Sequence, residues 1–448
     1  MAGGTWQKQD KVLPGVYVNF TSEKTLGLSI GSRGVVAICE PMSWGKVGEI
    51  VTIELGDDTT PFCGYPIYAP QAKFLKEIFR GSNRTDAPTK VLLYRPDASG
   101  SVAATVTTGA LTITALYKGV RGNDVTIVIT EQVDAEGTFD VETVIDGVIV
   151  DTQTAKNAEE LKPNKWVKFS GSGALAETAG TKLQSGADGT VQVGAYTTFL
   201  KAIEPYDFDI IIYDGKDETV KTAMTNFVER LANTQGKYSQ LVAQGITTPD
   251  SRFVINVDPK ITGIVLSDGT KLTDGQICWW VGGAEAGAAY NKSLTYARYP
   301  QAVEVLPAAT IDEMKTAVKS GYLTLFSQDR ETQVLQDINS LVTYNDDITE
   351  PYHKNRVIRT LHTIANDIYR QFSKDFIGVV DNNENGRMLF KSVICGYMLD
   401  LQTNNAIQNF LPDDVEVLAG NDIDSIVINI WVQPVDAVEK IYTTISVS

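Results

Sequence analysis

Few residues of this chain combine the types and spacing that catalysis or metal binding requires. The sequence holds two histidines, His353 and His362. They lie nine positions apart, so they cannot face one metal ion as an i, i+4 pair on a helix. We therefore expect both histidines to be structural or surface residues.

One string resembles the nucleophile motif of serine hydrolases. Residues 27–31 read Gly-Leu-Ser-Ile-Gly, which matches GxSxG. That motif needs a strand before the serine and a helix after it, whereas an apolar strand-like run, Val35–Ile38, follows Ser29 here. We expect a loop. A hydrolase that uses Ser29 and His362 is an alternative, which labelling of Ser29 by a serine-reactive probe would support.

A second string resembles the start of a calcium-binding loop. Residues 381–386 place oxygen donors at positions one, three and five and glycine at six. Position twelve is Ser392, where such loops need a bidentate glutamate. We expect a turn between helices. Residues 282–287 lack dinucleotide-site spacing, and the Trp279–Trp280 pair reads as core. The sequence thus predicts no catalytic, cofactor or metal residue, and no enzyme.

Composition and net charge argue against several further classes of function. The 448 residues carry a net charge of −16, with 43% hydrophobic and 21% charged residues. At about 150 residues per domain, some three domains are expected. The acidic balance argues against binding nucleic acid or an anionic membrane. No apolar run approaches the ~18 residues of a membrane helix, and the first residues do not resemble a secretory signal. Four scattered cysteines predict reduced thiols.

The sequence at each end of the chain predicts a β-strand. The stretches 13–20 and 439–448 are short, and in the second apolar β-branched residues alternate with polar ones. We predict that each is a lone strand without a partner in its own chain. Such an edge is a template for joining another chain. The predicted inter-subunit strand-exchange residues are Val16, Tyr17, Val18, Phe20, Ile441, Tyr442, Thr443, Ile445 and Val447.

The residues between these arms divide into three parts. Alternating strand and helix patterns over 21–96 and 191–335 predict an α/β domain with a largely parallel sheet. Short strands over 97–190, followed by Gly/Ser-rich stretches, predict an inserted antiparallel β module. Residues 336–435 predict a C-terminal α+β domain with two long helices near 352–373 and 387–401. The arms are 1–20 and 436–448.

The order of several motifs resembles contractile tail sheath proteins of myovirus-type phages and R-type bacteriocins, most closely those from Gram-positive bacteria. The N-terminal motifs are Leu13–Asn19 and Arg33–Ile38 with Trp44-Gly45. The middle one is Tyr117–Asp124. The C-terminal ones are Asp337–Thr343, Asn355–Arg359, Ile364–Ile368, Gly386-Arg387 and Gln433–Tyr442.

This resemblance implies a structural subunit with a subtilisin-like α/β domain that lacks the protease site; residues 191–335 contain no histidine. It implies hexameric rings stacked helically around an inner tail tube protein, with strands lent between neighbouring subunits. Contraction would drive the tube through a bacterial envelope. Baseplate and tail terminator proteins are the further partners implied, with assembly in the bacterial cytoplasm and a place in a virion tail or bacteriocin particle.

Two other classes stay open from the sequence. One is a different phage tail or capsid assembly protein that does not contract, and the appearance of long tubes of sheath-like diameter would separate it from a sheath. The other is a secreted β-rich adhesin, against which the first residues and the scattered cysteines argue.

Overall fold

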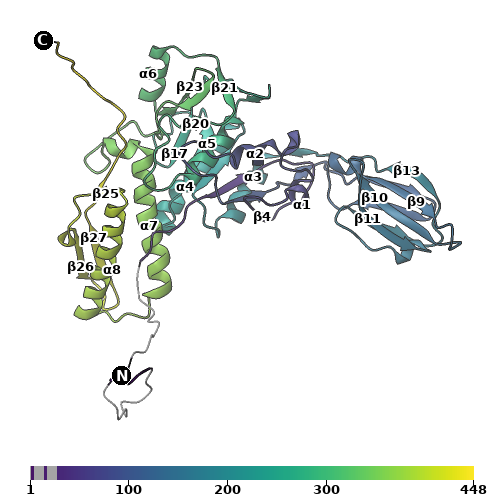
Figure 1. Cartoon of the computed structure of the whole chain (residues 1–448), viewed down its shortest axis with the longest axis horizontal. Coiled ribbons are helices and arrows are strands. Elements are labelled where there is room, and N and C mark those ends of the chain that lie inside the picture. Colours follow the sequence, from purple (N-terminus) through teal and green to yellow (C-terminus); the bar gives the residue numbers. More distant parts are fainter. Residues whose placement is uncertain (1, 5–14, 18–27, 448) are drawn as a thin grey trace.

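A seven-stranded sheet forms the centre of the protein in a computed structural model that describes residues 2–4, 15–17 and 28–447 (Figure 1). The strand order is β22-β17-β16-β15-β3-β5-β4, and every neighbouring pair is parallel except β4–β5. The predicted largely parallel sheet is therefore confirmed. The strands are β3 (Val35–Cys39), β4 (Ile50–Glu54), β5 (Lys90–Tyr94), β15 (Ile210–Tyr213), β16 (Gln240–Gln244), β17 (Val254–Val257) and β22 (Tyr322–Leu323).

Helices cover both faces of this sheet, which explains why its central strands are almost entirely buried and largely apolar. Because side chains alternate along a strand, Ile210 and Ile212 of β15 pack on one face, whereas Ile211 and Tyr213 pack on the other. The first face is covered by α2 (Lys73–Ile78) and α5 (Ile277–Gly287), and the second by α3 (Val193–Ile203) and α4 (Glu218–Gln235).

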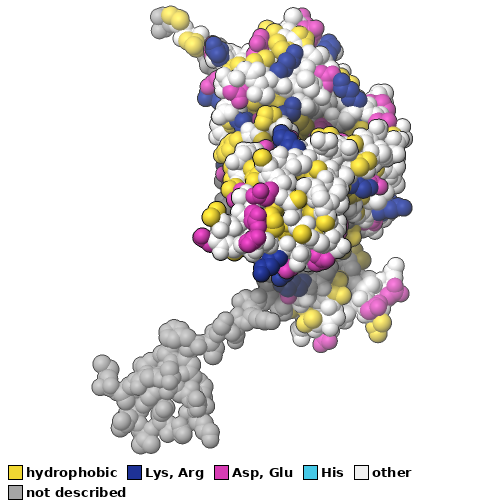
Figure 2. Space-filling model, turned by 90° about the vertical axis from the view of Figure 1, so that its right-hand side faces the viewer, with side chains coloured by type: hydrophobic (Ala, Val, Ile, Leu, Met, Phe, Trp, Pro, Cys, Tyr) yellow, Lys and Arg dark blue, Asp and Glu magenta, His cyan; other side chains and the backbone are white. Residues whose placement is uncertain are grey.

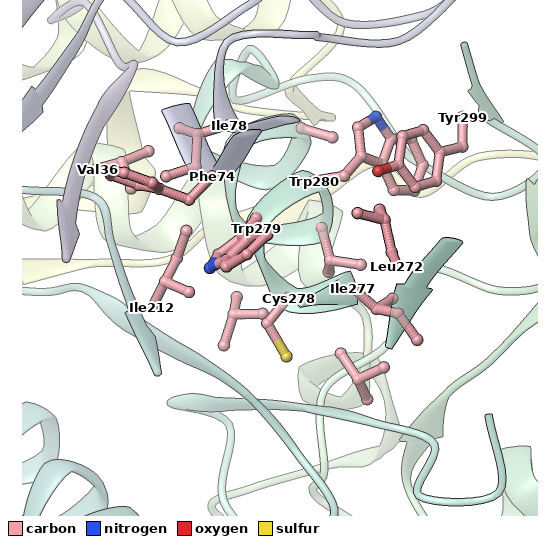
Figure 3. Packing of buried hydrophobic residues seen from close by; sticks show 14 of the residues in the cluster. Val36, Phe74, Ile78, Ile212, Leu272, Ile277, Cys278, Trp279, Trp280 and Tyr299 are labelled. Atoms are coloured by element: carbon pink, nitrogen blue, oxygen red, sulfur yellow. The ribbon is translucent and has the colours of Figure 1, made fainter. Parts of the chain in front are cut away.

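Helix α5 is buried along its length and supplies the centre of the first core (Figure 3). Trp279 and Trp280 are both buried, which confirms their expected core role, and Trp280 stacks on Tyr299 with ring centroids 4.1 Å apart. A Cβ at Gly283 would lie 2.0 Å from the carbonyl oxygen of Ile78. The small residues of 282–287 thus allow α5 to pack closely.

The inserted β module is a two-sheet sandwich that projects from the body (Figure 1). One sheet has the order β11-β10-β9-β13 and the other β12-β8-β7. Every second residue of β10 is buried, from Phe139 to Ile145, because one face of each sheet turns towards the other. The strands are β7 (Thr105–Thr108), β8 (Leu111–Ala115), β9 (Thr126–Glu131), β10 (Phe139–Ile145), β11 (Val148–Ala155), β12 (Val167–Gly171) and β13 (Thr178–Lys182).

A short neck joins the sandwich to the α/β part. It consists of β6 (Ala98–Ser99) paired with β14 (Thr190–Val191). Arg121 reinforces this joint: its guanidinium donates to the carbonyl oxygen of Gly64 at 2.9 Å and to both carboxylate oxygens of Asp146 at 2.9 and 2.6 Å. Trp44, which precedes β4, packs into the sandwich core against Trp166 at 4.8 Å. The sandwich is therefore clamped at its base.

The C-terminal part consists of two long helices and two small two-stranded sheets. Helices α7 (Asn355–Asp375) and α8 (Glu384–Thr403) pack against the hairpin β26–β27 and the β25–β28 pair. Helix α8 begins three residues before the predicted start, because the Asn383 side chain caps it by accepting from the amide of Gly386 at 2.9 Å. The strands are β25 (Ile407–Gln408), β26 (Val415–Ala419), β27 (Ile426–Ile430) and β28 (Gln433–Pro434).

Smaller elements complete the α/β part. Helix α6 is Ile311–Lys319, and Thr310 caps it by accepting from the amide of Glu313 at 3.3 Å. Among the described helices, none is both long and apolar enough to cross a membrane. The remaining elements are α1 (Thr60–Cys63), β18 (Gly263–Leu266), β19 (Lys271–Thr273), β20 (Arg298–Tyr299), β21 (Ala302–Leu306), β23 (Leu325–Gln328) and β24 (Glu331–Val334).

Candidate assembly interface

The C-terminal tail, residues 441–447, stands clear of the body (Figures 1 and 2). Its apolar side chains are almost fully exposed: Ile441 is 82% exposed and Val447 is 94% exposed. The tail forms no strand within its own chain. Within these seven residues, four large hydrophobic side chains are exposed to solvent: Ile441, Tyr442, Ile445 and Val447. Exposed apolar surface of this density is uncommon on isolated proteins, so the tail is a candidate interaction segment.

A hydrogen-bonded anchor fixes the point where this tail begins. The Glu439 carboxylate accepts from Thr295 Oγ1 and from Gln336 Nε2, each at 2.6 Å, and pairs with Lys354. Burial acts to raise the pKa of Glu439, but these donors outweigh it and hold the pKa below its usual value. The tail therefore leaves the body from one defined position.

The N-terminal prediction is wrong in one respect. Strand β2 (Gly15–Tyr17) is not a lone strand, because it pairs in parallel with β1 (Ala2–Gly4) of the same chain. Val16 and Tyr17 lie in β2, whereas Val18 and Phe20 lie outside the described residues. Parallel pairing still leaves the second edge of each strand available.

The hairpin β26–β27 offers an edge that could receive an extended segment. In the part of the chain that the structure describes, β27 pairs only with β26. Ile428 and Ile430 of β27 pack against the core of the C-terminal part. Residues 426–430 carry no charge and no proline, the features that usually protect a sheet edge. The edge is therefore chemically suited to accept another strand.

A buried ion cluster joins α7 to the α/β part and so positions both the tail anchor and the hairpin. Arg359 of α7 is fully buried, donates to Asp337 at 2.6 Å, and pairs with Glu285 of α5. Asn355 donates to Asp337 at 2.9 Å. Burial acts to raise the pKa of Asp337, but Arg359 and the other hydrogen-bond donors hold it below its usual value. The pKa of Glu285 is raised well above its usual value, mainly by burial and to a smaller extent by the negative charge of Asp337.

The residues considered for catalysis do not form a catalytic site. His362 is buried between Tyr238 and Phe253, and burial lowers its pKa well below the usual range. His353 is also buried, with Nδ1 2.6 Å from the carbonyl oxygen of Leu341. Both histidines are structural, as predicted. Ser29 lies in an irregular segment that leads into strand β3, so the helix of a nucleophile elbow is missing.

Residues 381–383 lie in the turn between α7 and α8, as expected, whereas residues 384–386 form the first turn of α8. The structure finds no group of three or more metal-ligating side chains in residues 2–4, 15–17 and 28–447. The four cysteines are free thiols, in agreement with their scattered positions.

Family models match most of the chain. The phage tail sheath protein β-sandwich domain matches residues 99–188, the central domain of the same family matches 189–340, and its C-terminal domain matches 347–448. The Bacillus subtilis (strain 168) phage-like element PBSX protein XkdK is 33% identical over 480 aligned positions, which cover 100% of both chains.

Two solved structures extend this likeness. The sheath tail protein of Desulfitobacterium hafniense is 42% identical, with a TM-score of 0.85 over 96% of this chain and 99% of that one. The helical sheath of the anti-feeding prophage in its contracted state is 13% identical, with a TM-score of 0.58 over 97% and 99% of the two chains, and shares the fold. The chain belongs to the phage tail sheath protein family.

Proposed function

We propose that this protein is the structural subunit of a contractile tail sheath and not an enzyme. Subunits would stack as hexameric rings around an inner tube protein, and shortening of the sheath would drive that tube through a bacterial envelope. The observation that carries the proposal is the C-terminal tail, which is anchored at Glu439 and exposed beyond it. Family membership gives the tail a partner, namely another copy of the chain.

The tail is proposed to add a strand to a neighbouring subunit. Each backbone hydrogen bond gained contributes about 0.5–1.5 kcal/mol, and burial of each of Ile441, Ile445 and Val447 contributes about 1.5–3 kcal/mol. Tyr442 and Thr443 would lie on alternate faces of the added strand. The uncharged edge of β27 is the acceptor that best fits an extended apolar segment. Val16, Tyr17, Val18 and Phe20 are proposed to take part from the other end of the chain.

Strands donated in this way would hold neighbouring subunits together while other surfaces of the subunits exchange contacts during contraction. Exposed ion pairs give only about 0–1 kcal/mol each, so contraction would need many small contacts added over many subunits. We place these contacts mainly in residues 21–335. The proposed division of labour follows the predicted parts: arms at 1–20 and 436–448, the α/β domain at 21–96 and 191–335, the β module at 97–190, and the C-terminal domain at 336–435.

Finer features of the proposal rest on the resemblance alone. They are a subtilisin-like topology of the α/β domain, capping by baseplate and tail terminator proteins, and assembly in the bacterial cytoplasm within a phage tail or bacteriocin particle. The family match supports the partner class, because sheath proteins assemble with copies of themselves.

Deletion of residues 441–448 tests the central step. The deleted residues contribute nothing to the described core, so the variant should fold as the full chain does, with the same circular dichroism and melting temperature. It should form no tubes in electron micrographs. Tubes of normal length from the deletion variant would contradict the proposal.

A further inference from the structure

An apolar patch surrounds the point where the tail leaves the body. A cavity of about 430 Å³ is lined by Ile311, Met314 and Val318 of α6, by Tyr296 and Leu335, and by Glu439 and Lys440 at the tail root. A second cavity of about 510 Å³ is also lined by Glu439 and Lys440 at the tail root and includes Val342 and Tyr344. In Figure 1, α6 lies on the side of the molecule from which the tail departs.

Helix α6 presents its large apolar residues in an unusual direction. A surface helix normally turns such residues towards the core. In α6 the buried residue is Ala317, whereas Met314 and Val318 are only half-buried and Ile311 is 67% exposed. The three larger residues recur at i, i+3 and i+7 and therefore form one stripe along the rim of the cavity. Among the described residues, this stripe is only partly covered, and Ile311 is the most exposed of the three.

The backbone at the patch is also unusual. Tyr296 has a φ of 58°, a left-handed conformation that an aromatic residue rarely adopts, and its side chain is half-exposed beside the stripe. Its neighbour Thr295 is one of the residues that hold Glu439. A strained, exposed aromatic residue next to the tail anchor is consistent with a surface that is used in contact.

The short length of the tail indicates which molecule covers this apolar patch. Residues 441–447 extend at about 3.3 Å per residue, so they reach no more than about 23 Å from the root. A neighbour that receives this tail must bring its acceptor within that distance, and its surface then faces the patch. The rim carries Lys319 and Lys440, besides Lys315, which pairs with Asp312 at 3.1 Å. A second copy, with its net charge of −16, supplies an excess of carboxylates that can pair with Lys319 and Lys440.

We propose that the α6 patch, defined as Ile311, Met314, Val318 and Tyr296, is an inter-subunit surface that packs against the copy that receives the tail. The inference rests on the proposed strand donation. It adds a side-chain interface at the root of the tail, which would fix the direction in which the tail leaves.

A charge-matched pair of full-length variants tests this interface. Ile311→Glu places a carboxylate on the stripe, at the first position of α6, where negative charge favours the helix. Thr316→Glu adds the same charge on the opposite side of α6, at an exposed residue. We expect Ile311→Glu to lower tube yield at least tenfold and Thr316→Glu less than twofold, with unchanged melting temperatures. Equal tube yields for the two variants would overturn the proposal.

A second measurement identifies the occupant directly. A photo-crosslinking amino acid at position 314 is introduced into tubes grown from a mixture of ¹⁴N- and ¹⁵N-labelled subunits. Mixed-isotope cross-links between position 314 and another copy would support the proposal. Cross-links confined to one copy, or to an added inner tube protein, would overturn it. If deletion of residues 441–448 still abolishes tubes in that case, strand donation stands and only the α6 interface fails.

Discussion

Two joints connect the α/β part to its neighbours, and they use charge in opposite settings. At α7, Arg359 and both of its carboxylate partners are fully buried. At the sandwich, the Arg121 side chain reaches Gly64 of the α/β part and is 3% exposed, but its ionic partners Asp124 and Asp146, which belong to the sandwich, are 49% and 58% exposed. Removing Arg359 would leave a buried carboxylate without a counter-charge. Removing Arg121 would leave carboxylates that water can still solvate. Loss of the arginine should therefore cost more stability at the C-terminal joint than at the sandwich.

The largest expected effect comes from the buried joint. Arg359→Met should lower the free energy of unfolding by about 3–5 kcal/mol, because it leaves the buried Asp337 carboxylate without a counter-charge and Glu285 without its donor. Urea unfolding of the purified subunit measures this loss. Lys374→Met, at an exposed position of the same helix, serves as the control and should change the free energy by less than about 0.5 kcal/mol. Equal losses in the two variants would remove the role assigned to the cluster.

Within the buried joint, the two carboxylates should not be equivalent. The pKa of Asp337 is lowered and that of Glu285 is raised, so the proton is favoured on Glu285. Glu285→Gln preserves an acceptor for Arg359 and supplies a donor towards Asp337, and should cost about 1 kcal/mol. Asp337→Asn removes the charge that Arg359 needs and should cost about 2–4 kcal/mol. The reverse order in urea unfolding would show that the charge resides on Glu285.

The exposed joint should respond less. Arg121→Ala removes hydrogen bonds to Gly64 and Asp146 and the contact with the Tyr65 ring, whose centroid lies 4.1 Å from the guanidinium carbon. We expect a loss of about 1–2 kcal/mol, together with faster proteolysis near the neck. Lys156→Ala, on the exposed surface of the sandwich, provides the comparison. Unchanged proteolysis in Arg121→Ala would mean that Trp44 and the neck strands suffice to hold the sandwich.

The smallest effect should appear on acidification. The hydrogen bonds from Arg121 hold the pKa of Asp146 below its ordinary value of 3.8, despite partial burial, which acts in the opposite direction. Because the folded-state pKa is the lower one, the pair stabilises the fold fully above pH 3.8. That contribution is lost as the pH falls through the folded-state pKa. The stability difference between the natural chain and Asp146→Asn should therefore shrink below pH 3.8. A difference that stays constant on acidification would contradict this.

The sequence predicts elements well where the signal is local. The parallel strands are recognisable because burial on both faces leaves runs such as 210–213 apolar, and α6 and α7 have clear helical periodicity. Strand β1 gives no such signal, since Ala2–Gly4 carries no apolar alternation. The pairing of β2 with β1 was therefore missed.

The anchors of the candidate interface depend on contacts that are distant in sequence. Arg359 finds its partners at residues 285 and 337, and Glu439 finds its partners at 295, 336 and 354. The sequence around a single arginine in a helix, or around a glutamate before a tail, does not predict such distant partners. The exposed tail itself was predictable, because period-two alternation of β-branched residues is a local pattern.

Electron cryomicroscopy of tubes assembled from the full-length chain tests the central claim most directly. The account predicts that residues 441–447 of one subunit run beside a strand of another subunit at the 4.7–4.9 Å spacing of a β-sheet. A tail that packs on its own subunit, or that contacts no sheet in the assembled tube, would contradict it.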